Sequence, residues 1–173
     1  MQRHVIGPYA VLHTGARKLL RRWSIVKFAA LAEALHQEFG LEIVFAGSED
    51  EQRDIQRIQE KISFPTYSFA GQGNLLEFAA VCYRAKIFIG NDSGPMHIAS
   101  ACGIPVIGLF GPGMPDAFGP AGQQSVVIHH KLPCHPCDQV NCVLPDNPCI
   151  NHIALDEVLA ACRQSLPSQH AEQ

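Results

Sequence analysis

The sequence predicts an α/β fold built on a Rossmann-like, doubly wound parallel sheet. Short apolar runs alternate with amphipathic helical patterns along the chain, which is typical of βαβ units. Glycine, proline, serine and asparagine stand between these segments, where helices and strands start and stop. The length of 173 residues and a hydrophobic share of 47% suit a single domain around one core, and we place it at residues 1–173.

The first 61 residues contain two predicted strands and two predicted helices. Residues 9–12 are a short apolar run and form the first strand. Residues 24–39 form a helix, because apolar side chains recur there every three to four positions between a serine and a glycine. The second strand covers 41–46. A charged helix at 48–61 follows, with acidic residues in its first turn, where they complement the helix dipole.

The same alternation continues to the end of the chain. Asn74 is placed to cap one helix, Pro95 to occupy the first turn of another, and Gly103 to close it. A Gly/Pro-rich loop covers 111–122, and a cysteine-rich loop covers 131–150. The remaining strands are predicted at 66–70, 86–90, 104–110 and 125–129, and the remaining helices at 74–85, 95–102 and 155–165.

Charge and hydropathy exclude several classes of protein. The net charge of -3 supplies no basic surface for nucleic acid. No apolar run approaches the roughly 18–20 residues that cross a bilayer. The first four residues, Met-Gln-Arg-His, lack the apolar stretch of a signal peptide. We therefore expect a cytoplasmic protein with no transmembrane segment and no nucleic-acid partner.

Polar residues follow three of the predicted strands, at 13–16, 47–49 and 90–97. In open α/β sheets, ligands bind in the crevice beyond the carboxyl ends of the strands. We expect these segments to build one site. Their pattern matches neither the Gly-x-Gly-x-x-Gly fingerprint nor the P-loop, which argues against a dinucleotide or NTPase site.

The segment 90–97, Gly-Asn-Asp-Ser-Gly-Pro-Met-His, leads from a strand into a helix. The N–H groups and dipole at the start of that helix favour an anion, and Gly94 allows a close approach to the backbone. We predict a diphosphate site with His97 as an added donor. Asp92 would accept hydrogen bonds from hydroxyl groups or fix the loop. The alternative is a tight Asn-Asp-Ser-Gly turn beside a histidine that is satisfied within the protein.

The other two segments add candidate contacts. Thr14 and Gly15 offer a hydroxyl and backbone N–H groups. Glu49 could accept hydrogen bonds from a ribose, or it could serve only its own helix as a first-turn acid. One of the basic residues in 17–22 could pair bidentately with phosphate, the others forming a solvated basic loop.

Four cysteines fall within the loop 131–150, and three others read as small core residues. Cys134, Cys137, Cys142 and Cys149 begin with the close spacing that is typical of thiolate metal sites. Four thiolates could hold a structural zinc ion and order the loop. Disulfides and free thiols are the alternatives that this spacing leaves open.

Together these segments resemble glycosyltransferase family 9, the ADP-heptose:lipopolysaccharide heptosyltransferases. Residues 88–101 and 103–112 are close to the central signature of that family, and 13–16 and 21–23 are similar to its His-x-Gly-Ala and Lys-x-Trp elements. The similarity runs from about residue 9 to residue 163. It is far more specific than any one of these motifs.

The resemblance implies the GT-B architecture, in which the active site lies between two Rossmann-like domains and the C-terminal one binds the donor nucleotide. It implies that the phosphates and sugar of an ADP-sugar are held by Asp92, Ser93, Gly94 and His97, and that Thr14 and Gly15 approach the diphosphate. Arg21 stands where the family usually has lysine, which keeps the charge but changes the geometry. The implied reaction transfers heptose, or another sugar, to a lipopolysaccharide core acceptor with inversion. It needs no metal cofactor, because positive groups and a helix N-terminus stabilise the departing diphosphate.

The resemblance implies that the chain corresponds to the second domain alone, which would be a departure from the two-domain pattern of the family. In the family, the N-terminal domain carries the acceptor site and the acidic general base, so no catalytic residue is assigned here. We expect the chain to bind a nucleotide sugar and to transfer nothing alone. The acceptor would be met through that other domain, which is compatible with peripheral contact with the inner membrane. The alternatives are a stand-alone nucleotide-binding or regulatory domain without catalysis, and a metal-stapled scaffold.

Overall fold

A computed structural model describes residues 7–166. Its centre is a six-stranded sheet in the order β3-β2-β1-β4-β5-β6, and every neighbouring pair is parallel. This order, with β1 and β4 adjacent at the centre, is that of a doubly wound Rossmann-like sheet, so the predicted fold class is confirmed. The strands are β1 (Tyr9–His13), β2 (Glu42–Ala46), β3 (Tyr67–Ser68), β4 (Ile87–Asn91), β5 (Val106–Phe110) and β6 (Ser125–His129).

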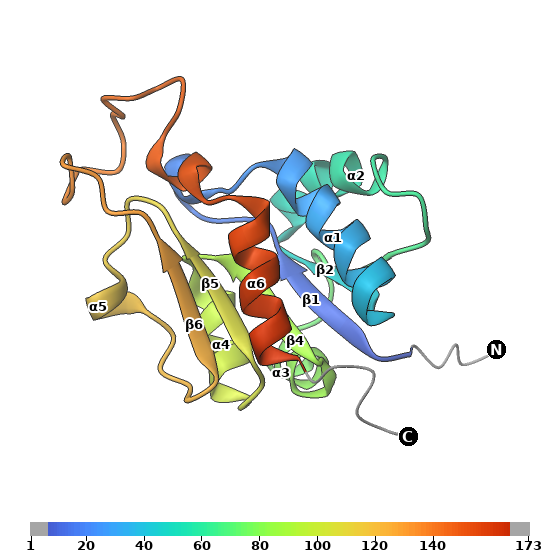
Figure 1. The fold of residues 1–173 in the computed structure, drawn as a ribbon. Helices are drawn as coiled ribbons and strands as arrows, with labels where there is room; N and C mark the ends of the chain where they lie inside the picture. Colours follow the sequence, from blue (N-terminus) through green and yellow to red (C-terminus); the bar gives the residue numbers. More distant parts are fainter. Residues whose placement is uncertain (1–6, 167–173) are drawn as a thin grey trace.

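Helices cover both faces of the sheet. In Figure 1, α1 and α6 lie in front of the strands and α3 and α4 lie behind them. The α-helices are α1 (Ile25–Phe39), α2 (Gln52–Gln59), α3 (Leu75–Arg84), α4 (Gly94–Ala101), α5 (Pro115–Phe118) and α6 (Leu155–Ser165). Short 3-10 helices are η1 (Leu19–Arg21), η2 (Glu49–Glu51) and η3 (Cys149–His152).

Each face of the sheet has its own apolar core because successive strand side chains point to opposite sides. Along β1, Ala10 and Leu12 pack with α1, α2 and α6, whereas Tyr9 and Val11 pack with α3 and α4. Burial on both faces explains why β1, β4 and β5 read as continuous apolar runs instead of alternating ones.

The predicted elements are present, with three local differences. The charged helix predicted at 48–61 is divided into η2 and α2, and the strand predicted at 66–70 shortens to β3 at the sheet edge. The loop predicted at 111–122 contains the short helix α5. Asn74 caps α3 as expected, since its side-chain oxygen accepts from the backbone N–H of Leu76 and Glu77. Within residues 7–166, no helix is long and apolar enough to cross a membrane.

Candidate functional site

The buried side chain of Asn91 ties the ends of β4 and β1 together. Its Oδ1 accepts from the backbone N–H of Trp23 at 3.0 Å, and its Nδ2 donates to the carbonyl oxygens of Thr14 at 2.8 Å and Gly15 at 3.3 Å. Asn91 is fully buried, so each of these bonds replaces one that water would otherwise make. The loop after β1 is therefore held against the turn after β4.

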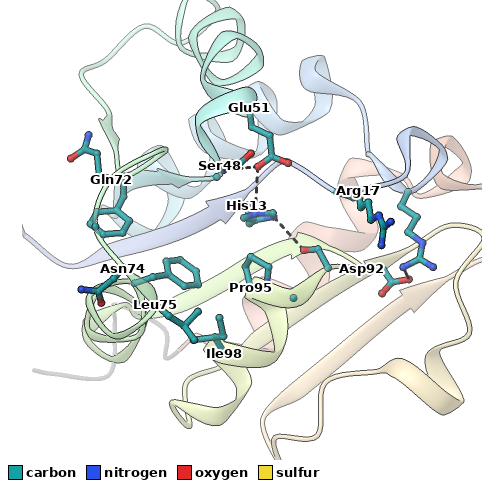
Figure 2. Close-up of a pocket in the computed structure, with 18 residues that line it drawn as sticks. His13, Arg17, Ser48, Glu51, Gln72, Asn74, Leu75, Asp92, Pro95 and Ile98 are labelled. Atoms are coloured by element: carbon teal, nitrogen blue, oxygen red, sulfur yellow. Dashed lines mark hydrogen bonds and ion pairs between the residues drawn. The ribbon is translucent and has the colours of Figure 1, made fainter.

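A cavity of about 680 Å³ opens at this carboxyl edge of the sheet. Figure 2 shows its walls, which come from the ends of β1, β2 and β4 and from the starts of α3 and α4. This is the crevice in which doubly wound proteins bind ligands. The three polar segments singled out in the sequence thus meet at one site.

One end of the cavity is apolar. Phe69 and Phe78 line it with their ring centroids 6.4 Å apart and their planes 25° from parallel. Ile98 of α4 and the exposed Leu75 of α3 complete this end. Such a lining suits a flat apolar group, and neighbouring polar groups of Gln72 and Asn74 can orient it.

The start of α4 faces the same cavity. Ser93, Gly94 and Pro95 line it, and Ser93 makes no side-chain cap to the helix. A Cβ atom added to Gly94 would meet nothing within 4 Å, so the backbone here borders open space. Backbone N–H groups at a helix start favour anions, and α4 presents this end to the cavity.

Two arginines add positive charge beside the start of α4. Arg17 and Arg21 both line the cavity, and Arg21 Nη1 lies 3.0 Å from Asp92 Oδ2. Burial raises the pKa of Asp92 above its ordinary value, while the charges of Arg21 and His97 act in the opposite direction. Arg21 therefore stands between a buried carboxyl and the space where an anion would bind.

A second polar cluster joins β1, β2 and β4. Glu51 Oε2 lies 3.8 Å from Nε2 of the buried His13 and accepts from the backbone N–H of Ser48 at 2.9 Å (Figure 2). Ser93 Oγ lies 3.4 Å from His13 Nδ1. Burial lowers the pKa of His13, although the nearby Glu51 opposes that shift. The ring is therefore neutral at pH 7.

The structure brings half of the predicted site residues to the cavity wall. Those that line it are Arg21, Asp92, Ser93 and Gly94. His97 lies exposed on α4 and does not line the cavity, although its charge still acts on Asp92. Glu49, the first residue of η2, also lies exposed outside the lining. The carboxylate that lines this wall is that of Glu51.

Thr14 and Gly15 stand just behind the wall. Both are buried, and the carbonyl groups of both bond Asn91. The hydroxyl of Thr14 is buried without a hydrogen-bond partner among residues 7–166. A Cβ atom on Gly15 would lie 1.7 Å from Oε1 of Glu51, so the glycine makes room for that carboxylate.

Glu51 and the aromatic pair lie outside the segments that the sequence singled out, whereas His13 is the first residue of the segment 13–16. A signal for Glu51 was present, because Ser48 and Glu51 have the spacing of a capping box. Such a box places the third residue of the helix back over the helix start, here at the end of β2. No comparable signal marks Phe69, which follows β3, and Phe78, which lies in α3, because the two rings meet only in the folded chain.

The four cysteines of the loop 131–150 surround a second, smaller cavity of about 80 Å³. Cys149 is buried and the other three are half-buried. Burial, together with these neighbouring thiols, raises the pKa of Cys149 to about 11. Among residues 7–166 the cysteines are unpaired thiols, and no three His, Cys, Asp or Glu side chains are arranged to hold a metal ion. The zinc site stays a prediction.

Of the three predicted core cysteines, Cys82 and Cys162 are buried and Cys102 is half-buried.

The fold and the cavity define a Rossmann-like α/β domain with a ligand site beyond the carboxyl edge of its sheet. Residues 2–147 match the family model described as glycosyltransferase family 9 (heptosyltransferase). The chain belongs to this family. The structure also confirms the predicted likeness to half of a GT-B heptosyltransferase.

Known relatives agree with this assignment. Lipopolysaccharide heptosyltransferase 3 of Escherichia coli is 36% identical over 107 residues, covering 60% of this chain and 31% of the relative. The solved E. coli ADP-heptose lipopolysaccharide heptosyltransferase II is similar in fold, with a TM-score of 0.76 and 24% identity over 91% of this chain and 46% of that one. An E. coli heptosyltransferase solved with ADP gives a TM-score of 0.73 and 19% identity, over 94% and 46%. The chain thus spans less than half the length of each.

Proposed function

We propose that this chain is the donor-binding, C-terminal half of a heptosyltransferase. It binds an ADP-sugar, with heptose as the first candidate, for transfer to a lipopolysaccharide core acceptor carried by the N-terminal half. One observation carries the proposal: a single cavity joins an apolar end to a positively charged end at the edge of the sheet where nucleotides bind. The heptosyltransferase that was solved with ADP supports the choice of nucleotide.

In this proposal each part of the donor meets a different wall of the cavity. The adenine ring lies between the apolar side chains near Phe69 and Phe78, and Glu51 accepts hydrogen bonds from the ribose hydroxyls. The diphosphate meets the start of α4 at Gly94 and the guanidinium of Arg21. Asp92 repels phosphate, so its carboxyl group serves the hydroxyls of the sugar.

The chemistry of transfer divides between the two halves. An oxygen of the acceptor forms a bond to the anomeric carbon, and the bond from that carbon to the β-phosphate oxygen breaks, leaving its electron pair on ADP. Arg21 and the start of α4 stabilise the charge that develops on the departing diphosphate, without a metal ion. The base that takes the acceptor proton belongs to the N-terminal half, so this chain by itself binds the donor without turnover.

Calorimetric titration of the chain with ADP, GDP and UDP tests the proposal. We expect ADP to bind most tightly and Arg21→Ala to weaken it by roughly tenfold or more, since a charge-assisted bond to phosphate is lost. Exchange of the exposed Arg53, which lies outside the cavity lining, for alanine is the matched control. A preference for UDP would contradict the heptosyltransferase assignment but not the fold. Transfer of heptose from ADP-heptose by the chain alone would contradict the proposal that the catalytic base belongs to the N-terminal half.

A further inference from the structure

The guanidinium of Arg21 is held from two sides. Asp92 Oδ2 lies 3.0 Å from Nη1, and Oε1 of Gln139 accepts from Nε at 2.7 Å and from Nη2 at 2.5 Å. Arg21 and Gln139 are 118 residues apart in the sequence. The contact therefore joins the wall of the donor cavity to the cysteine-rich loop 131–150, which Figure 1 shows as the orange segment beyond the end of β6.

Other contacts fix this part of the loop in place. Lys18 Nζ donates to the carbonyl oxygen of Asp138 at 3.1 Å, beside Gln139. The carboxylate of Asp138 accepts from the backbone N–H groups of Val140 at 2.8 Å and Asn141 at 3.0 Å, which shapes the turn around Gln139. Gln139 itself has a φ of 61°, a left-handed conformation that a non-glycine residue adopts at a cost.

The chemistry of an amide suits a positioning role. A neutral oxygen can hold the Nε and Nη2 side of the guanidinium without cancelling its charge, as a second carboxylate would. The guanidinium carries enough N–H groups that both terminal nitrogens still have donors for Asp92 and for a ligand. Without Gln139, Asp92 would be the remaining anchor at the guanidinium, and it would draw the charge toward itself and away from a phosphate.

We propose that Gln139 is a positioning residue that aims Arg21 at the donor phosphates, so that the cysteine-rich loop controls the phosphate end of the cavity. This inference rests on the proposed function, because Arg21 must meet a phosphate for its aim to matter. Gln139 acts through Arg21 and does not itself line the donor cavity.

The test is a double-mutant cycle read with two probes, ADP and adenosine. Gln139→Asn keeps an amide and tolerates the left-handed backbone, but its side chain is one carbon too short to reach Arg21. We expect ADP to bind this variant roughly tenfold more weakly and adenosine to bind it as tightly as wild type, because only ADP carries phosphate. In an Arg21→Ala background, Gln139→Asn should have no further effect on ADP.

Two more variants sharpen the outcome. Gln139→Glu should also weaken the binding of ADP, because the new carboxylate neutralises the charge of Arg21. Val140→Ala, a change at an exposed neighbour in the same turn, should leave both affinities unchanged. Equal ADP binding by wild type and Gln139→Asn, or an equal loss for ADP and adenosine, overturns the positioning role while the proposed function stands. If the wild-type chain does not bind ADP at all, both the proposed function and the positioning role of Gln139 are overturned.

Discussion

The carboxylate of Glu51 occupies the space that a side chain at Gly15 would need. A Cβ atom there would lie 1.7 Å from Oε1 and 2.0 Å from Cδ of Glu51. The loop after β1 and the helix start after β2 can pack together only because residue 15 has no side chain. This packing sets Glu51 between His13 and Ser48, with its oxygens at the cavity wall.

Gly15→Ala should displace Glu51. Because the site is closely packed, we expect a loss of about 1–3 kcal/mol in the free energy of unfolding, together with weaker ADP binding. Urea denaturation and calorimetry measure the two effects. Gly7→Ala is the matched control, since a Cβ there would meet only Cγ of Glu42, at an ordinary contact distance of 3.8 Å, and Gly7 lies outside the cavity lining. Unchanged stability of Gly15→Ala would show that Glu51 moves aside freely.

Glu51→Gln tests the ribose contact directly. The variant keeps the shape of the side chain but loses its charge, and hydrogen bonds to charged acceptors are the stronger ones. We expect ADP to bind roughly fivefold to tenfold more weakly, while 2′,3′-dideoxy-ADP binds both proteins equally. The parallel change Glu49→Gln, at an exposed residue outside the cavity lining, should leave ADP binding unaltered. If Glu49→Gln weakened ADP binding more than Glu51→Gln did, the ribose contact would be assigned to Glu49.

Asn91→Ala should be among the most destabilising substitutions at the site. It leaves the backbone N–H of Trp23 and the carbonyl of Thr14 without their buried partner. We expect a cost of about 2–4 kcal/mol in the free energy of unfolding, because unpaired buried groups lose their hydration as well. Chemical denaturation checks this. Asn141→Ala, at an exposed asparagine that bonds only within its own turn, should cost far less.

The neutral, buried His13 makes stability depend on pH. Burial lowers the pKa of His13 in the folded state, whereas in the unfolded chain the pKa of this histidine keeps its ordinary value of 6.5. Below pH 6.5 the unfolded chain therefore takes up a proton at His13 that the folded chain does not. Stability is therefore fully present above pH 6.5 and falls as pH drops from 6.5 toward the lowered value. The melting temperature should decline over this range in wild type and decline less in His13→Gln. His97→Gln, at an exposed histidine, should keep the wild-type slope; an identical slope in all three proteins would exclude His13 as the cause.

Elemental analysis decides the state of the cysteine loop. We propose that Cys134, Cys137, Cys142 and Cys149, which surround one small cavity, hold a structural zinc ion when the protein is purified without chelator. Burial and the neighbouring thiols raise the pKa of Cys149, and a bound cation would oppose that effect. We expect about one zinc ion per chain, lost in Cys137→Ser. Metal-free protein with wild-type stability would exclude the site, and thiol counting would then separate disulfides from free thiols.

The sequence by itself determined the order and type of nearly all the elements. Helix caps such as Asn74 and apolar runs such as those in β4 and β5 are local signals, since the residues that define them are neighbours in the chain. The sequence also placed Asp92, Ser93 and Gly94 at the cavity. These residues follow a central parallel strand, and in a doubly wound sheet the ligand crevice lies at the carboxyl ends of the central strands.

Only the tertiary structure decided which of the nearby polar residues reach the cavity. Glu51 rather than Glu49 lines it, because the capping box holds the Glu51 carboxylate at the backbone N–H of Ser48. His97 lies exposed on α4, outside the lining. The contact between Gln139 and Arg21 depends on how a loop without hydrophobic periodicity lies against a distant 3-10 helix. Such contacts depend on side-chain packing between segments far apart in the chain, for which residue spacing carries no signal.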